Sequence, residues 1–119
     1  MMRFKRSEKV GDQIREEISQ ILLRELKDPR IGFVTITTVA VSDDLRTAKV
    51  YYSVFGGEQD KEESYKGLES AKGYIKRELG RRMRLKYMPE IIFMFDDSFE
   101  YGEHIEELLR DVKDSGEKQ

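Results

Sequence analysis

The sequence predicts a single α+β domain in which a three-stranded mixed sheet carries helices on one face. Three observations support this prediction: a helical apolar pattern precedes two β-rich segments, a second helical segment follows them, and a short apolar run comes last. The chain has 119 residues, which is the size of one domain with one core. Although 39% of the residues are charged, the net charge is only −2, and the apolar residues are strongly patterned. We therefore expect the chain to fold.

The first predicted helix follows Ser7, a residue type that caps helix N-termini. It should end at Asp28-Pro29, because the residue before a proline is disfavoured in helical geometry. Its apolar residues recur at helical spacing and are Ile14, Ile18, Ile21, Leu22 and Leu26.

Two strands are predicted over residues 33–41 and 47–55, joined as a hairpin by a turn at 42–45. In the first strand, Val34 and Ile36 fall on one face but Val39 and Val41 fall on the other. This change of phase indicates either a β-bulge or a strand that is buried on both faces.

A second helical segment begins near residue 58, and Gly67 and Gly73 predict that it is weak or broken. The apolar run at 91–95 predicts the third strand. A helical crossover connects it to the second strand, so the two should lie parallel.

Positive charge is concentrated at residues 70–86, which we interpret as one helix. From position 72 to position 86 there are seven basic residues and one acid, in a protein whose net charge is −2. On a helical projection of about 100° per residue, Ile75, Leu79 and Met83 fall on the side opposite the charges. The stripe itself contains Gly73, Gly80, Arg77 and Arg84, with Lys76 and Arg81 on its shoulders.

The glycines of this stripe do not favour a helix, since each costs about 1 kcal/mol relative to alanine. They do allow another backbone, such as a phosphodiester, to come close. The alternative is a solvated basic helix face with a kink at Gly73. Arg82 falls on the apolar side, so either the helix ends before it or its aliphatic stem packs and its charged end reaches solvent.

Groups for catalysis are scarce. There is no cysteine, and the only histidine, His104, lies in an acidic stretch. Asp96 and Asp97 are a conceivable magnesium pair, but Ser98 after them is more typical of a helix cap. No phosphate-binding glycine motif occurs. We expect no enzymatic activity, no metal and no cofactor.

The expected cellular compartment is inferred from features that the sequence lacks. The lack of cysteine fits a reducing cytoplasm. No apolar run approaches the roughly 20 residues of a membrane span, and no secretory signal is recognisable at the N-terminus. We expect a cytoplasmic protein without membrane association.

The sequence favours nucleic-acid binding over catalysis, because a basic stripe can neutralise phosphates and release counterions. The N-terminal residues Arg3, Lys5 and Arg6 form a second basic cluster. An aromatic RNA platform on the second strand, made by Tyr51, Tyr52 and Phe55, is less favoured, because Tyr52 belongs to the apolar face. The predicted RNA contacts are Arg3, Lys5, Arg6, Lys72, Lys76, Arg77, Arg81, Arg84 and Lys86.

The C-terminal part, residues 96–119, contains nine acids and three bases. Ile105, Leu108, Leu109 and Val112 recur at helical spacing and predict a short amphipathic helix. We therefore expect a domain over residues 1–112 and a flexible acidic tail over 113–119.

The predicted element order, helix, strand, strand, helix, helix, strand, is that of a type II KH domain, in which a GxxG loop between two helices clamps a nucleic-acid backbone. No GxxG occurs, and Ala71-Lys72-Gly73 stands where that loop would fall. In this respect the chain resembles the ribosome-binding factor A family over about residues 3–112. The stretches that carry the resemblance are Leu26-Lys27-Asp28-Pro29-Arg30, Val34-Thr35-Ile36, Val41-Ser42-Asp43-Asp44-Leu45, Ala48-Lys49-Val50-Tyr51, and Asp97-Ser98 followed by Gly102, Ile105, Leu108 and Leu109.

The resemblance implies a non-enzymatic assembly factor that binds the immature 30S small ribosomal subunit. It further implies support for 5′-end processing of 16S rRNA and an association with growth in the cold. Ala71 and Gly73 would form the interhelical kink, and the basic residues of the following helix would contact RNA. We expect a monomer. Two alternatives remain: a protein-interaction module that docks a basic ribosomal protein through the acidic C-terminal helix, and a small hydrolase using Asp96 and Asp97.

Overall fold

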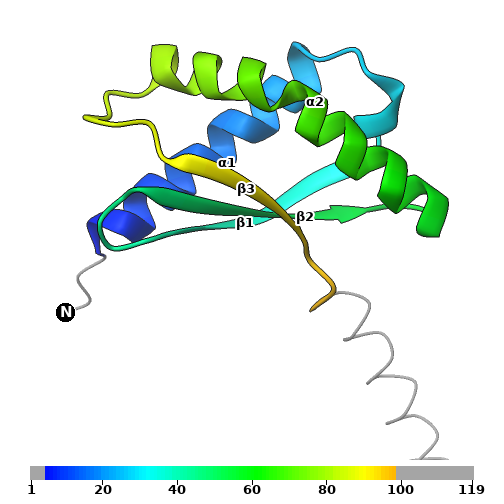
Figure 1. Ribbon diagram of the computed structural model, residues 1–119, viewed down its shortest axis with the longest axis horizontal. Coiled ribbons are helices and arrows are strands. Elements are labelled where there is room, and N and C mark those ends of the chain that lie inside the picture. The colour runs from blue at the N-terminus through cyan, green and yellow to red at the C-terminus, as the bar shows by residue number, and fades with distance from the viewer. Residues whose placement is uncertain (1–4, 99–119) are drawn as a thin grey trace, which may run out of the picture.

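The computed structural model describes residues 5–98, and these form two helices, a short 3-10 turn and three strands (Figure 1). The order of the elements agrees with the sequence prediction. The predicted C-terminal helix and the predicted tail at 113–119 lie outside the described residues. The elements are α1 (Arg6–Arg24), η1 (Pro29–Ile31), β1 (Val34–Val41), β2 (Thr47–Val54), α2 (Glu58–Arg82) and β3 (Glu90–Phe95).

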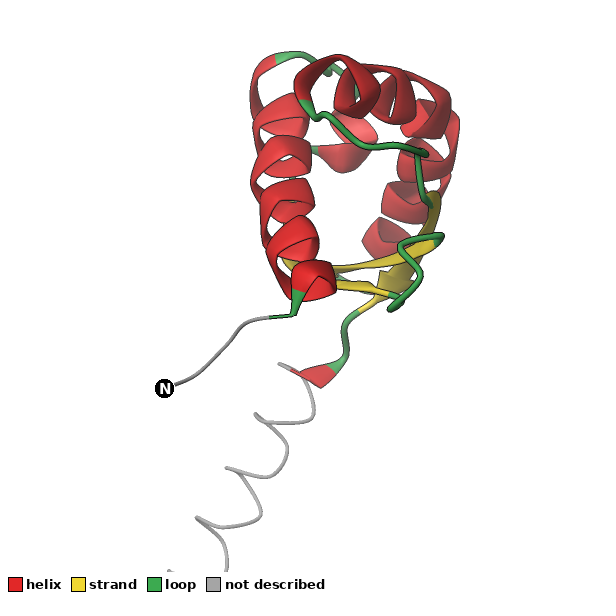
Figure 2. Cartoon of the chain, turned by 90° about the vertical axis from the view of Figure 1, so that its left-hand side faces the viewer, coloured by secondary structure: helices red, strands yellow, loops and turns green. Residues whose placement is uncertain are grey.

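The three strands form one mixed sheet in the order β1-β2-β3. β1 pairs antiparallel with β2, and β2 pairs parallel with β3 across the α2 crossover. Both helices lie over the same face of this sheet, which Figure 2 shows from one end of the molecule. The predicted fold class is therefore confirmed. None of the helices within residues 5–98 is long and apolar enough to cross a membrane.

A β-bulge in β1 explains the change of phase in its apolar pattern. The register with β2 shifts between Ile36 and Thr38, so Ile36 and Val39 are both buried, at 5% and 9% exposure. Thr37 and Thr38 between them are exposed. Of the two readings of the sequence, the bulge is confirmed, because it brings the whole apolar set of β1 to the helix-covered face.

The core lies between that face and the two helices. Fully buried side chains come from every layer, with Ile14 and Ile18 on α1, Leu68 and Leu79 on α2, and Val50 on β2. Two glycines permit close approach. A Cβ at Gly11 of α1 would lie 2.6 Å from the Val39 carbonyl oxygen, and a Cβ at Gly67 of α2 would lie 2.8 Å from Cγ2 of Ile31.

α2 differs from its prediction in two respects. It is one helix of 25 residues that runs through Gly67 and Gly73, where the sequence predicts a weak or broken helix. Figure 1 shows that the two halves of α2 nevertheless run in different directions. The helix also ends at Arg82, and Met83 adopts an extended conformation, so Arg84 and Lys86 lie in a loop and not in a helix as predicted.

The packing at Gly11 can be tested by Gly11→Ala. We expect a loss of unfolding free energy of about 1–2 kcal/mol, because the added methyl meets a backbone oxygen that cannot rotate away. Urea denaturation of the full chain measures the change. Gly73→Ala is the matched control, since a Cβ there meets no atom within 4 Å. An equal or greater stability of Gly11→Ala would contradict this account of the α1–β1 contact.

Candidate nucleic-acid interface

The C-terminal half of α2 separates charge from core as the sequence predicts. Ile75, Leu79 and Met83 are buried against the sheet side. Gly73, Arg77, Gly80 and Arg81 are exposed, and Lys76 is half-buried. We call Lys72, Lys76, Arg77, Arg81, Arg84 and Lys86 the cationic surface.

The cations of this surface differ in how far other side chains neutralise them. Lys72 pairs with Glu69 at 3.1 Å, and its Nζ lies 5.7 Å from the ring centroid of Phe93. Arg81 pairs with Glu78 at 3.1 Å but remains 75% exposed. The other four cations form no ion pair with any residue of the described part, and they are Lys76, Arg77, Arg84 and Lys86. These four retain their charge for a ligand.

Arg82 has a different position and a structural role. Its guanidinium pairs with Glu17 and Glu25 at 3.2 and 2.5 Å and lies 3.8 Å from Glu78. It thereby joins the end of α2 to α1. Desolvation acts to lower the pKa of Arg82, but the hydrogen bond to Glu17 and the charges of Glu25 and Glu78 raise it overall. Burial and the same two neighbouring carboxylates, Glu25 and Glu78, raise the pKa of the Tyr74 hydroxyl.

The N-terminal cluster and the α2 cluster meet at one end of the molecule. Arg6 and Lys86 line the same cavity of about 200 Å³, together with Leu85 and Tyr87. The loop after α2 is held there by a hydrogen bond from the Glu90 N–H to the Arg46 carbonyl, at 2.8 Å. Figure 2 looks onto this end, where α1 begins and the loop from α2 descends to the sheet.

The other predicted RNA contacts near the N-terminus are Lys5 and Arg3. Lys5 is exposed and lines a neighbouring hollow with Ser7 and Val39. Neither Lys5 nor Arg6 forms an ion pair with a residue between 5 and 98. Arg3 lies outside the described residues.

Among the described residues that line the cavity shared by Arg6 and Lys86, Asp44 is the one carboxylate. It accepts hydrogen bonds from the Ser42 hydroxyl at 2.7 Å and from the Arg46 N–H at 3.0 Å. These bonds, that of Ser42 first, lower the pKa of Asp44 and keep it ionised within the turn. Its charge offsets only part of the positive charge around the cavity.

Gly73 and Gly80 are not required by packing within the described structure. A Cβ at Gly73 would meet no atom within 4 Å, and one at Gly80 would lie 3.7 Å from Cε of Met88, an ordinary contact. Gly73 therefore leaves open surface between the cations, and the position of Gly80 has room for a methyl group.

Asp96 and Asp97 do not form a metal site with other described residues. Asp96 accepts hydrogen bonds from the Thr37 hydroxyl at 2.6 Å and from the Ser98 N–H at 2.9 Å. Bonds from Ser98 and then Thr37 lower the pKa of Asp96, as expected for a turn carboxylate. Within residues 5–98, no group of three or more potential ligands is arranged to hold a metal ion. His104 lies outside the described residues.

The aromatic residues considered for an RNA platform, Tyr51, Tyr52 and Phe55, do not form a continuous stacking surface. Tyr52 is only 2% exposed and packs edge-on against Phe95 with the ring centroids 5.8 Å apart. This confirms that Tyr52 belongs to the core. Phe55, in contrast, is exposed and contacts Phe33, a pair that the sequence reasoning missed.

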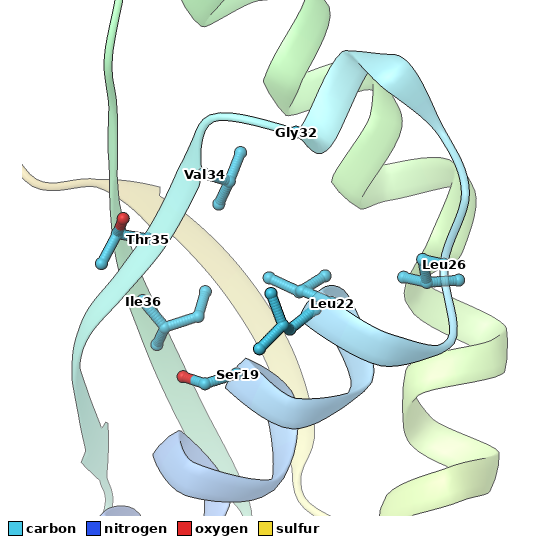
Figure 3. A pocket seen from close by; sticks show the side chains of 8 residues that line it. Ser19, Leu22, Leu26, Gly32, Val34, Thr35 and Ile36 are labelled. Atoms are coloured by element: carbon cyan, nitrogen blue, oxygen red, sulfur yellow. The ribbon is translucent and has the colours of Figure 1, made fainter.

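An apolar groove between α1 and β1 was also missed. Its volume is about 350 Å³, and Figure 3 shows Leu22 of α1 and Val34 of β1 on its two sides. Leu23, also on its wall, is 82% exposed. The adjacent leucines at 22 and 23 were a signal for it, because consecutive helical residues cannot both face one core.

The role of Arg82 can be tested by Arg82→Gln. We expect a lower urea midpoint and unchanged RNA binding, because the variant leaves Glu17 and Glu25 without their cation, whereas Glu78 keeps its pair with Arg81. Arg81→Gln, at a far more exposed position, is the control and should leave the midpoint nearly unchanged. If both variants unfold at the wild-type midpoint, Arg82 does not hold the helices together.

The glycines can be tested by Gly73→Ala and Gly80→Ala. Each should raise the unfolding free energy by up to about 1 kcal/mol, since alanine is the better helix former. Each should also weaken binding of structured RNA, because a methyl group holds the phosphodiester away. Ser70→Ala, on the same helix and exposed, controls for the substitution. Unchanged RNA binding by both glycine variants would refute a role in backbone approach.

Known proteins resemble this chain in sequence and in fold. The family model described as ribosome-binding factor A matches residues 6–109. The ribosome-binding factor A of Citrifermentans bemidjiense is 50% identical over 116 residues, covering 96% of this chain and 98% of that protein. The crystal structure of ribosome-binding factor A from Thermus thermophilus is 25% identical, with a TM-score of 0.66 over 74% of this chain and 93% of that one.

A further similar structure is a homology model of the Thermus thermophilus factor, fitted into the cryo-EM map of a 30S–RbfA complex. It is 23% identical and has a TM-score of 0.63, with 76% of this chain and 96% of that one covered, so it supports the fold. The family model spans nearly the whole chain, and the bacterial relative is half identical to it. The chain therefore belongs to the ribosome-binding factor A family.

Proposed function

We propose that this protein is a cytoplasmic, non-enzymatic assembly factor that binds the immature 30S ribosomal subunit and contacts its 16S rRNA. The observation that carries the proposal is the cationic surface, in which Lys76, Arg77, Arg84 and Lys86 have no carboxylate partner among the described residues. Cations without a carboxylate partner gain binding free energy from phosphates, since each contact releases counterions from the nucleic acid.

Family membership supports the choice of partner. The relatives are named as ribosome-binding factors, and the Thermus thermophilus model was placed in the map of a 30S complex. The net charge of this chain is −2, so its affinity for RNA must come from a local surface and not from the overall charge.

The mode of binding that we propose is recognition of phosphates and RNA shape. α2 runs through Ala71 and Gly73 without a GxxG loop, so a four-nucleotide clamp of the KH type has no counterpart here. We propose instead that Ala71, which packs against the core, and Gly73, which faces open space, form the kink that lets the RNA backbone approach. Arg3, Lys5 and Arg6 extend the contact beyond α2. The predicted consequence is support for late maturation and 5′-end processing of 16S rRNA.

The proposal is tested by replacing Arg77, Arg81 and Arg84 together with alanine. Binding to purified 30S subunits should weaken, and the slope of log affinity against log salt should become shallower by about two to three, since up to three phosphate contacts are lost. Sedimentation binding across a salt series measures both quantities.

A matched triple variant, in which Arg24, Lys27 and Lys66 become alanine, removes the same charge elsewhere and should retain the salt slope. In cells that lack the gene, the Arg77, Arg81 and Arg84 variant should fail to restore 5′-end processing of 16S rRNA, whereas the control should restore it. Wild-type affinity and salt slope in a folded Arg77, Arg81 and Arg84 variant would sink the proposal.

A further inference from the structure

Two aromatic rings stand on the surface at the end of the molecule away from the end of α2. Phe33 is 65% exposed and Phe55 is 83% exposed, and their ring centroids are 6.3 Å apart. Phe33 precedes β1 and Phe55 follows β2. In Figure 1, β2 ends and α2 begins on the right, whereas α2 ends on the left, so the pair is well separated from Arg84 and Lys86.

The backbone holds these rings in an ordered position. The Phe55 N–H donates to the Phe33 carbonyl at 3.2 Å, and the Gly57 N–H donates to Oδ2 of Asp60 at 2.9 Å. Gly56 has a φ of +148°, and a Cβ there would collide with the Asp60 side chain. The turn is thus built around glycine and Asp60, and it exposes Phe55 as part of its structure.

A cavity of about 240 Å³ opens beside Phe33. Pro29 and Val54 supply apolar walls, and Asp60 and Glu63 supply carboxylates. Ser64 also lines it and is 2% exposed. We call Pro29, Phe33, Val54, Phe55, Asp60, Glu63 and Ser64 the aromatic site.

The charge of the aromatic site is negative. Arg30, which also lines the cavity, is neutralised by a bidentate pair with Asp28, with 2.6 Å between Nη2 and Oδ2. That side-chain hydrogen bond lowers the pKa of Asp28 and keeps the pair charged. Glu63 lies 3.7 Å from Lys66 and also interacts electrostatically with Arg30, whose pKa it helps to raise. Residues 58–71 carry five acids and two bases, so the first half of α2 surrounds the site with negative charge.

We propose that the aromatic site docks a protein segment that carries arginine or lysine next to an apolar residue. A guanidinium or ammonium group stacks on Phe55 and pairs with Glu63, while the apolar neighbour enters the cavity beside Val54. The same chain already makes such contacts internally, with Nζ of Lys61 at 4.7 Å from the ring centroid of Phe95. RNA fits less well, because its phosphates would face Glu63 and Asp60.

This inference does not rest on the proposed function, because it concerns a different end of the molecule and a partner of different chemistry. The protein would then have two binding surfaces at opposite ends, the cationic surface for phosphates and the aromatic site for a basic protein segment. The two can therefore be tested separately.

The test is an NMR titration of the ¹⁵N-labelled full chain with a short synthetic peptide that contains arginines and leucines. Shifts should concentrate at residues 30–33, 54–57 and 60–64. Phe55→Ala and Glu63→Gln should each raise the dissociation constant about fivefold, the effect of one cation–aromatic or charged contact. A peptide with citrulline in place of arginine should bind more weakly by a similar factor. Tyr87→Ala removes an aromatic ring that is 66% exposed at the other end, and it should have no effect.

Shifts spread over the acidic residues in general, or unchanged affinity in both Phe55→Ala and Glu63→Gln, would overturn the assignment. Binding of a single-stranded RNA oligonucleotide at residues 54–57 in preference to the peptide would also overturn it, by assigning the rings to RNA. The variant lacking Arg77, Arg81 and Arg84 should bind the peptide normally, and Phe55→Ala should bind protein-free 16S rRNA normally. Failure of either proposal therefore leaves the other standing.

Discussion

Burial of one sheet face under both helices is the constraint on which the rest of this structure depends. A three-stranded sheet can bury only a small apolar area, so each strand must direct its apolar residues to the face that the helices cover. The bulge at Thr37 achieves this for β1, since without it Val39 would face solvent when Ile36 is buried. Gly11 and Gly67 serve the same end by letting α1 approach the Val39 carbonyl and α2 approach Ile31. The outer surfaces of the helices are then free to carry charge.

That freedom is used unequally along α2. Its first half is acidic and its second half is basic, which also matches the helix dipole, with carboxylates near the N-terminus and cations near the C-terminus. Because α2 connects β2 to β3, its negative charge lies at the end of the molecule where β2 ends, and its positive charge lies at the end where β3 begins. The two surfaces for which we propose partners, the cationic surface and the aromatic site, occupy these opposite ends. Electrostatic complementarity would orient such a protein between an RNA and a basic protein segment.

Basic residues that are neighbours in the sequence differ in role because of their tertiary partners. Arg81 and Arg82 are adjacent, yet Arg81 is 75% exposed whereas the Arg82 side chain is 28% exposed and joins α1 to α2. A change at Arg82 that reduced RNA binding would therefore need a stability measurement before it could be interpreted as a lost contact. Arg77 and Arg84 require no such separation, because no described residue pairs with them.

The sequence by itself determined the order of the elements, the parallel pairing of β2 with β3, the buried positions Ile75, Leu79 and Met83, and the exposure of the basic stripe. The buried and exposed positions follow from the periodicity of apolar residues within one segment. The parallel pairing follows from the rule for strands that are joined by a helical crossover. Only the tertiary structure decided that α2 continues through Gly73, that Arg82 meets Glu17 and Glu25, that Arg6 and Lys86 share one cavity, and that Phe33 contacts Phe55. The physical reason is that each of the last three contacts joins residues that are far apart in the chain. The apolar and charge patterns of a segment indicate which face of the element a residue lies on, but they do not indicate which distant residue it contacts.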